Sequence, residues 1–482
     1  MDDLIETGIQ AALRAGARYA DVRAIAPLRY EHLAVRNGEA SALTSSVRSG
    51  VGVRARTDRA WGFATAAELT RDAARSSGQL AARLAKAASR SVDRPLALTS
   101  DRSVRGGVYE TSLTVDPFEV PRDQKVELLV RAEKALHVES AVKTGHASYE
   151  AWEERKWFGN SEGSSYRSRI VHVGAGVEAT AIENGNVQQR SAPNSFGGDY
   201  RQGGWEFIES LGLPERSPEV GREAVALLHA RRCPTGSTTL VLGSSQLALQ
   251  VHESVGHATE LDRILAMEAG YAGTSFLTPK DLGRLKYGSL LMNIVADATE
   301  PGGLGTFGWD DEGVPARRTP IVRRGRLVGA LTSRETAARI GLRHSGATSR
   351  AEGFHRTPLI RMTNVDLQPG DHSFPELVEG VRDGVYLETN RSWSIDDRRL
   401  NFQFGTEAGF RIRKGEVAEL VRNPLYAGMT PEFWASMDAV GNRSTWHLWG
   451  VPNCGKGQPG QTARVGHGAP MARFRRVAVR GG

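Results

Sequence analysis

The sequence predicts an α+β protein in which an N-terminal α/β region, with an antiparallel sheet and helices, is followed by a β-rich, barrel-like C-terminal domain. Segments with helical periodicity alternate with strand-like segments in the first half of the chain. The 482 residues include 54 glycines, a frequency typical of folds with many tight turns. From about residue 285 onward, short strand-like segments are separated by turns rich in Gly, Asp and Asn. A chain of this length exceeds one ordinary core, so we expect two or three domains.

Residues 1–90 are predicted to form an α/β domain. Its first helix has apolar residues at helical spacing from Leu4 to Leu13, and Gly16 provides a stop. Asn37-Gly38 is a hairpin-type turn signal. The remaining predicted elements are strands at Tyr19–Ile25, Gly50–Arg54 and Trp61–Ala64 and an alanine-rich helix at Glu68–Ala88.

Residues 110–225 are predicted to form a middle α+β domain after a polar linker at 91–110. A helix is expected over Arg122–Leu136. Three strands should follow, at Ala141–Tyr149, Arg155–Phe158 and Arg167–Ala175, with a turn at Gly159–Gly163. A second helix should begin at Ser217 as its N-cap, with Pro218 in its first helical position.

Residues 226–482 are predicted to form the C-terminal β-rich domain. Thr238–Leu242 is an apolar, β-branched strand. We expect Ser244 or Ser245 to cap the short helix that follows it. That helix carries the motif on which the functional argument depends.

Bulk properties restrict the classes of function. No apolar run approaches the roughly 20 residues of a membrane span, and no apolar segment follows the acidic N-terminus, so we expect a cytoplasmic protein without a membrane partner. The net charge is +7, but the basic excess is scattered, which makes nucleic-acid binding an unfavoured interpretation. In a reducing compartment the two cysteines, Cys233 and Cys454, are not expected to form a structural disulfide.

The central motif is H-E-x-x-x-H, running from His252 through Glu253 to His257. Neutral imidazole nitrogens bind zinc, and a neighbouring carboxylate can take a proton from a water that the metal activates. The familiar spacing is H-E-x-x-H, which places both histidines on one helical face. Here one residue is added, and positions i and i+5 of an α-helix point about 140° apart. A π-bulge, or unwinding at Gly256, would bring both rings to one ion. The alternative is a helix with two unrelated histidines.

A catalytic zinc site needs a third protein ligand. The candidates are Glu260, Asp262, His447, His467 and Cys454. Cys454 is the most distinctive candidate. The two glycines that follow it, Gly455 and Gly457, expose the backbone, and Lys456 should lower the pKa of its thiol.

Two further polar runs have alternative interpretations. Asp310-Asp311-Glu312 is either a solvated turn or a group of acids that supports a histidine ligand or lies beside the metal. Arg361–Asn364 is polar within a strand-like segment and indicates little by itself.

These motifs occur in the order and at the approximate spacing found in the TldD/PmbA family, and the chain resembles the TldD (metallopeptidase) side of that family. The resemblance spans nearly the whole chain. The matching segments are Gly16–Arg23, Gly50–Arg54, Trp61–Ala64, His252–His257, Asp310–Pro315, Arg361–Asn364 and Cys454–Gln458.

The resemblance implies that His252, His257 and Cys454 bind zinc and that Glu253 is the general base. It also implies a peptidase that acts on small or unfolded peptides, paired either with a TldE/PmbA-type subunit or with a second copy of itself. The PmbA (TldE) branch lacks the metal motif, so this chain is not expected to belong to it. Asp262 matches an acid of the family, in a supporting role.

The sequence departs from the family pattern in two places. The segment Asn390–Trp393 lacks paired glycines, which should affect substrate or partner contacts. Cys233-Pro234 stands where Ala-Pro is commoner.

Two other classes of function remain open at this stage. The first is a non-catalytic peptide-binding or regulatory subunit, with the metal absent or held in a closed site in which His447 or His467 is the fourth ligand. The second is a nucleic-acid modulator, whose binding would depend steeply on salt.

Overall fold

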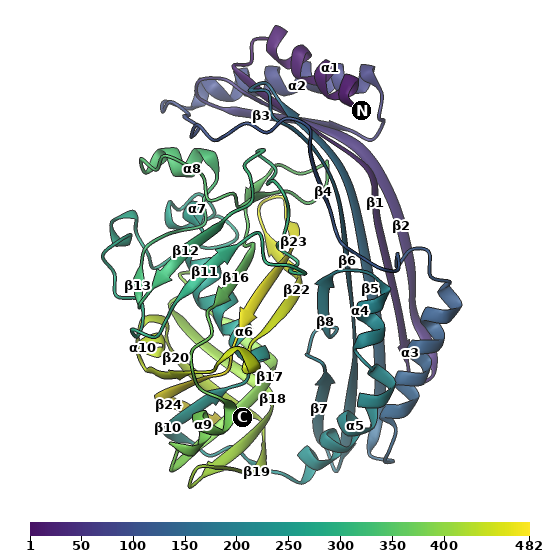
Figure 1. Cartoon of the computed structure of the whole chain (residues 1–482), viewed down its shortest axis with the longest axis vertical. Coiled ribbons are helices and arrows are strands. Elements are labelled where there is room, and N and C mark those ends of the chain that lie inside the picture. The colour runs from purple at the N-terminus through teal and green to yellow at the C-terminus, as the bar shows by residue number, and fades with distance from the viewer.

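The computed structural model describes all of residues 1–482 and consists of two layers that face each other (Figure 1). One layer is a long, curved sheet with helices packed at its two ends. The other is a compact C-terminal part rich in strands. The predicted α+β class, with a barrel in the C-terminal region, is confirmed.

The long sheet is built from four strands of 18 or 19 residues. Its order is β3-β2-β1-β5-β6-β4, and β7 and β8 also pair with β6. The elements of this layer are α1 (Asp2–Arg14), β1 (Tyr19–Arg36), β2 (Glu39–Arg56), β3 (Trp61–Ala66), α2 (Arg71–Ala88), β4 (Gly107–Glu110), α3 (Arg122–Leu136), β5 (Val142–Asn160), β6 (Ser165–Glu183), β7 (Asn186–Ala192), β8 (Asp199–Gln202), α4 (Trp205–Ser210) and α5 (Leu213–His229).

One sheet serves two separate hydrophobic cores. At one end α1 and α2 cover it, and apolar residues at helical spacing, such as Leu4, Ile5 and Ile9, pack against Val22 and Val53. At the other end α3 and α5 cover it in a second core. Because β1 pairs with β5 along most of its length, the predicted segments 1–90 and 110–225 contribute to the same sheet. The three-domain division remains a prediction.

The first hairpin turn forms as its sequence predicts. Asn37 and Gly38 both have positive φ, 49° and 80°, as a type I′ turn between two twisted strands requires.

The C-terminal part contains a closed barrel of five strands and a second sheet. The barrel runs β17-β10-β24-β20-β18 and closes because β17 also pairs with β18. The second sheet has the order β13-β12-β11-β16-β23-β22, which leaves β22 at an edge. The strands of this part are β9 (Arg231–Arg232), β10 (Gly236–Leu242), β11 (Ile294–Asp297), β12 (Arg318–Arg323), β13 (Arg326–Leu327), β14 (Ser349–Arg350), β15 (Leu359–Ile360), β16 (Asn364–Leu367), β17 (Asp383–Ile395), β18 (Asn401–Arg413), β19 (Glu416–Arg422), β20 (Pro424–Met429), β21 (Met437–Val440), β22 (His447–Lys456), β23 (Gln461–Ala469) and β24 (Ala472–Gly481).

The helices of this part are short, and one of them carries the motif. They are α6 (Ser244–Val251), α7 (Leu261–Ile264), α8 (Arg334–Arg339), α9 (Phe374–Glu379) and α10 (Thr430–Ala435). Helix α6 follows the buried strand β10 directly, and the two pack into the largest core of the molecule.

Two predicted helix starts were wrong. Helix α5 begins at Leu213, so Ser217 and Pro218 lie inside it, and the Ser217 hydroxyl donates to the Leu213 carbonyl instead of capping the helix. Helix α6 has Gly243 as its N-cap. The Ser244 hydroxyl donates to the carbonyl of Ala469 in β23 and so ties the helix to a neighbouring strand.

The strand prediction for the middle segment was too fragmented. Ala141–Tyr149 and Arg155–Phe158 belong to one continuous strand, β5. The polar residues between them do not end it, because the buried carboxylate of Glu153 pairs with Arg155 and Arg169.

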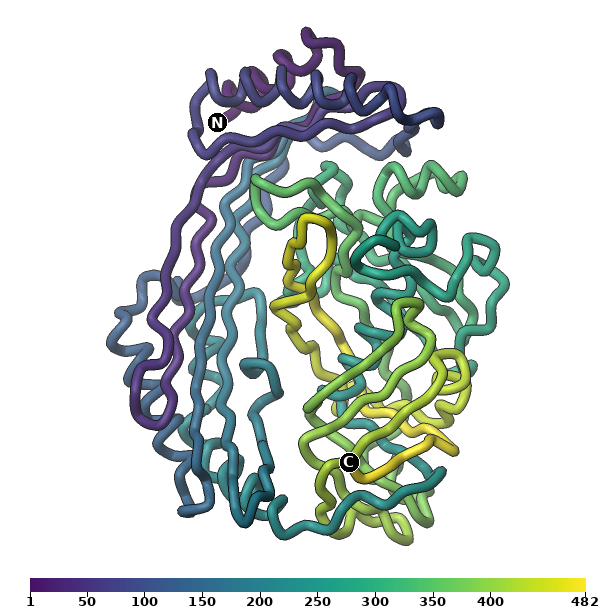
Figure 2. Tube along the Cα trace, turned by 180° about the vertical axis from the view of Figure 1, so that it is seen from behind, coloured from purple at the N-terminus to yellow at the C-terminus, as the bar shows by residue number.

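The hairpin β22–β23 lies on the side of the C-terminal part that faces the long sheet (Figure 2). His447 in β22 contacts Asp199 in β8 at 2.7 Å, and Arg464 in β23 donates to His172 in β6 at 2.9 Å. These contacts place one end of β22 against the long sheet and the other end beside the motif.

Candidate metal centre

The motif forms a single turn of π-helix from His252 to Gly256. The backbone N–H of His257 donates to the carbonyl of His252, an i to i+5 bond that inserts the extra residue of the motif into the turn. Glycine at 256 leaves room for buried Met362, because a Cβ there would lie 2.2 Å from its sulfur and force that side chain to move. The predicted widening of the helix is confirmed, and it brings the two imidazole ring centres to 4.8 Å.

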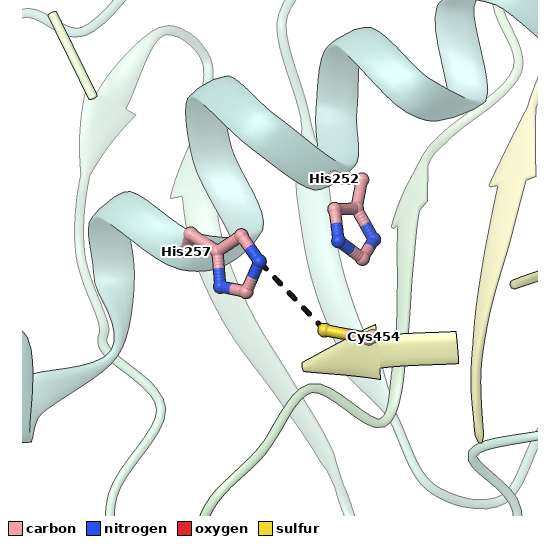
Figure 3. Close-up of side chains that lie close together, drawn as sticks. All are labelled: His252, His257 and Cys454. Carbon is pink, nitrogen blue, oxygen red and sulfur yellow. Dashed lines mark hydrogen bonds between the residues drawn. The ribbon is translucent and has the colours of Figure 1, made fainter. Parts of the chain in front are cut away.

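The structure gathers His252, His257 and Cys454 at one point (Figure 3). The histidines come from the π-turn after α6, and Cys454 comes from edge strand β22. One ligand atom from each residue lies within 4.8 Å of the others, and Cys454 Sγ is 3.7 Å from His257 Nε2. All three side chains are buried.

The hydrogen bonds of His252 fix its tautomer. His467 Nδ1 lies 3.0 Å from the Val365 carbonyl and must donate to it, so His467 Nε2 carries a lone pair. His252 Nδ1 lies 2.7 Å from that Nε2 and donates its proton there. The lone pair of His252 is therefore on Nε2 and is available to a metal.

His257 is oriented by a carboxylate. Its Nδ1 lies 3.0 Å from Glu260 Oε2, which also accepts from Arg263 at 2.6 Å. The Nδ1 proton points at Glu260, and Nε2 faces Cys454. Burial lowers the pKa values of His252 and His257, so both rings are in the neutral form that binds metals.

The surroundings of Cys454 favour its thiolate. Burial raises the pKa of the thiol, but the opposing effect of Arg361 and His257 is larger. The pKa of Cys454 therefore lies below the ordinary cysteine value. Arg361 is fully buried and donates to the carbonyl oxygen of Cys454. The predicted source of this effect was wrong. Lys456 instead donates to both oxygens of Asp262 at 2.8 Å and lies 3.3 Å from Glu260.

The remaining candidate ligands lie elsewhere or act indirectly. His447 pairs with Asp199, and Asp262 pairs with Lys456. His467 contacts the Nδ1 atom of His252, whereas the nitrogen of His252 that is available to a metal is Nε2, on the other side of the ring. None of these side chains faces the point shared by the three donors, which argues against the alternative of a closed site completed by His447 or His467.

Both interpretations of the acidic run at 310–312 were wrong. The three acids are buried, so they do not form a solvated turn, and the histidine partners are His467 and Glu260 instead. Asp311 pairs with Lys156 at 2.7 Å, and Glu312 lies 3.3 Å from Arg54. Because Lys156 and Arg54 belong to the long sheet, the run links the two layers of the molecule.

Glu253 has a partner that sequence reasoning missed. Its Oε2 accepts from Arg399 Nη1 at 2.7 Å. The two residues are 146 positions apart, and Arg399 lies in the turn between β17 and β18, so no local signal indicates the contact.

A cavity of about 300 Å³ opens on the motif. It lies between the layers, with walls from the loop after β7, from α6 and the π-turn, from β17 and its turn, and from β22. The predicted segment Asn390–Trp393 belongs to β17, and Trp393 lines the cavity with 47 % of its surface exposed. Trp393 meets Phe196 of the β7–β8 loop edge to face, with ring centres 5.3 Å apart.

The donor set fits zinc. Tetrahedral zinc, with sulfur at about 2.3 Å and nitrogen at about 2.0 Å, separates a sulfur donor from a nitrogen donor by about 3.5 Å. The separation of 3.7 Å between Cys454 Sγ and His257 Nε2 is close to this value, and all three donor atoms lie within 4.8 Å of one another, so a modest contraction would close the set around an ion. Three protein donors that face a cavity leave one tetrahedral position open.

Three domain models of a single protein family match successive parts of the chain. Models of the PmbA/TldA metallopeptidase domain 1, central domain and C-terminal domain match residues 28–93, 115–232 and 235–481. A metalloprotease of Methanothermobacter thermautotrophicus is 34% identical, over 96% of this chain and 95% of its own. A zinc metalloprotease TldD homologue of Saccharolobus solfataricus is 27% identical, over 51% of this chain and 52% of its own.

The fold is also shared with a solved structure. TldE from Thermococcus kodakarensis superposes with a TM-score of 0.74 at 18% identity, covering 99% of this chain and 100% of that one. With three family models along the chain and a relative matched over nearly its full length, this chain belongs to the PmbA/TldD metallopeptidase family.

Proposed function

We propose that the protein is a zinc-dependent peptidase that cleaves small or unfolded peptides. The observation that carries this proposal is the convergence of His252, His257 and Cys454 on one point, with the Nδ1 atom of each histidine already occupied by another residue. A zinc ion held there would supply the Lewis acidity that activates a water and polarises the scissile carbonyl.

Glu253 is the general base in this proposal. It follows the first metal-binding histidine directly and lines the same cavity. One of its oxygens accepts from Arg399, while Oε1 accepts no hydrogen bond within the chain. Glu253 would take a proton from the attacking water and later donate it to the amine that leaves.

Strand β22 supplies a place for the substrate. It is the edge of its sheet, and the residues from Trp449 to Gly455 line the cavity. Its unpaired side offers backbone donors and acceptors to an extended peptide, which would add as a further strand. A folded protein cannot present an extended segment inside a cavity of about 300 Å³, so the proposal predicts selectivity for unfolded substrates.

The partner is proposed to be either a second copy or a TldE/PmbA-type subunit. The likeness to a TldE fold and membership of the family support this proposal. No helix of the structure is both long enough and apolar enough to cross a membrane.

The test is cleavage of a mixture of unstructured peptides by the wild type and by Glu253→Gln. We expect the wild type to cleave short peptides and to leave intact a folded protein that contains the same peptide sequences. The variant should keep its zinc and lose on the order of 100-fold or more in rate, the contribution typical of a positioned general base. The alternative, a non-catalytic peptide-binding or regulatory subunit, predicts peptide binding without cleavage by the zinc-loaded wild type.

A further inference from the structure

Arg399 reaches Glu253 from the opposite wall of the cavity. Its Nη1 donates to Glu253 Oε2 at 2.7 Å, and both side chains are largely withdrawn from solvent, with 16% and 6% of their surfaces exposed. Charge-assisted hydrogen bonds of this kind are stronger and more directional than neutral ones. The contact is the only ion pair that Glu253 makes.

The backbone at Arg399 is held in a conformation that long side chains disfavour. Its φ is 62°, in the left-handed region. The turn is fixed by neighbours, since the Thr430 hydroxyl donates to the Arg399 carbonyl at 2.8 Å and the Arg399 N–H donates to Asp396 at 2.9 Å. Strained residues that their surroundings hold in place concentrate at functional sites.

The geometry divides the two oxygens of Glu253 between two tasks. Oε2 is anchored by Arg399, whereas Oε1 has no partner in the chain and is not sealed from the cavity. Arg399 Nε is buried without a hydrogen-bond partner, so the guanidinium is not placed there to satisfy its own donors. Its single side-chain hydrogen bond is to the carboxylate.

We propose that Arg399 is a positioning residue that anchors one oxygen of Glu253 and so aims the other at the attacking water. The inference deepens the proposed peptidase function and rests on Glu253 as its general base. An unanchored carboxylate samples several rotamers, and only some of them place an oxygen where the water is held. The left-handed turn at 399 supplies the direction from which the guanidinium can reach Oε2.

The decisive variant is Arg399→Gly. Glycine adopts positive φ without strain, so this change removes the guanidinium and favours the existing turn. Arg398→Ala is the matched control, because Arg398 is an exposed neighbour in the same turn and makes no ion pair. Arg399→Lys keeps the charge without the planar fork.

We expect Arg399→Gly to retain zinc and thermal stability and to lose on the order of 100-fold in kcat, the loss expected for a reacting group displaced by about 1 Å. KM should change little. Millimolar guanidinium ion should restore part of the rate to Arg399→Gly and none to Glu253→Gln. Arg399→Lys should be intermediate, and Arg398→Ala should match the wild type.

Three results would overturn the inference. If the wild type cleaves peptides and Arg399→Gly does so equally fast, the positioning role fails and the peptidase function stands. If Arg399→Gly loses zinc or melts well below the wild type, the residue is structural. If the zinc-loaded wild type cleaves nothing, the proposed function and the positioning role both fail.

Discussion

Each histidine of the motif takes its orientation from a residue that does not face the cavity. Glu260 fixes His257, and His467 fixes His252 through a chain that ends at the Val365 carbonyl. Such outer contacts set the tautomer and the direction of the metal-binding nitrogen. The site is therefore a set of five cooperating residues, of which the motif contains two.

His467 provides a test of this arrangement. His467→Phe keeps a ring in the buried space but removes the acceptor for His252 Nδ1, so we expect zinc affinity to fall on the order of 10- to 100-fold. Competition with a chromogenic chelator measures the affinity. His447→Phe is the control, because His447 pairs with Asp199 away from the proposed metal site, and this variant should bind zinc like the wild type. Equal affinities in both variants would show that the His467 contact is dispensable.

The sequence indicates the proposed metal-binding set better than it indicates the residues that support it. Two histidines at an unusual spacing and a cysteine in a glycine-rich loop are visible in the sequence, because ligand chemistry restricts residue types. Arg399 and Arg361 are not visible as site residues, since their contacts join segments 146 and 93 positions apart. Proximity in sequence pairs Lys456 with Cys454, whereas the fold presents it to Asp262.

At the level of single elements, the π-turn is the feature that makes H-E-x-x-x-H workable. Helix geometry predicts either such a turn or unwinding at Gly256, because an α-helix would point the two rings apart, and the structure shows the π-turn. The need for glycine at 256 does not follow from spacing. It arises from Met362, which packs against the turn from a distant strand-like segment.

Gly256→Ala should therefore destabilise the protein. The added Cβ would lie 2.2 Å from Met362 Sδ, and overpacking of this kind costs about 1–3 kcal/mol in unfolding free energy. Thermal or denaturant unfolding measures the loss. Gly455→Ala is the control, since a Cβ there meets nothing within 4 Å. Adding Met362→Ala should relieve the clash specifically, and a Gly256→Ala variant as stable as the wild type would contradict the packing argument.

Helix starts and strand lengths were less predictable than the elements themselves. Ser217 and Ser244 look like caps, but their hydroxyls bond to a carbonyl within the helix and to a neighbouring strand. Local sequence does not show which of these acceptors the fold will bring near. Strand β5 continues through charged residues because partners on the next strand satisfy them.

At the scale of the whole molecule, the cavity exists because two layers built from distant segments face each other. Buried polar residues join the layers. Asp311 and Glu312 reach Lys156 and Arg54 on the long sheet, and Glu407 in β18 accepts from Ser191 in β7 at 2.7 and 2.8 Å. The class of fold can be predicted from the composition and the hydrophobic pattern. The arrangement of the two layers face to face cannot, because it depends on contacts between segments hundreds of residues apart.

Glu407 makes stability depend on pH. Burial raises its pKa to about 7, whereas an unfolded glutamate titrates near 4.3. The folded protein thus binds one more proton than the unfolded chain between these values, so stability falls as pH rises through that window. The fall should amount to about 4 kcal/mol.

Unfolding of the wild type and of Glu407→Gln, followed from pH 4.5 to pH 8, measures this contribution. Glutamine keeps the shape and an acceptor oxygen but does not titrate. The variant should therefore gain stability relative to the wild type as pH rises and level off above about pH 7. A constant difference across the range would show that Glu407 is ionised in the folded protein.

In the proposed site, a cysteine from β22 completes a metal-binding set begun by two histidines of a π-turn. The most direct measurement is the zinc stoichiometry of Cys454→Ala beside that of the wild type and of Cys233→Ala, both measured after dialysis against a weak chelator. Cys233 is the buried cysteine outside the site, and its burial raises its pKa to about 11, so it should not contribute. We predict one zinc per chain in the wild type and in Cys233→Ala, and loss of most of the zinc in Cys454→Ala. Zinc bound by Cys454→Ala as tightly as by the wild type would contradict the ligand assignment.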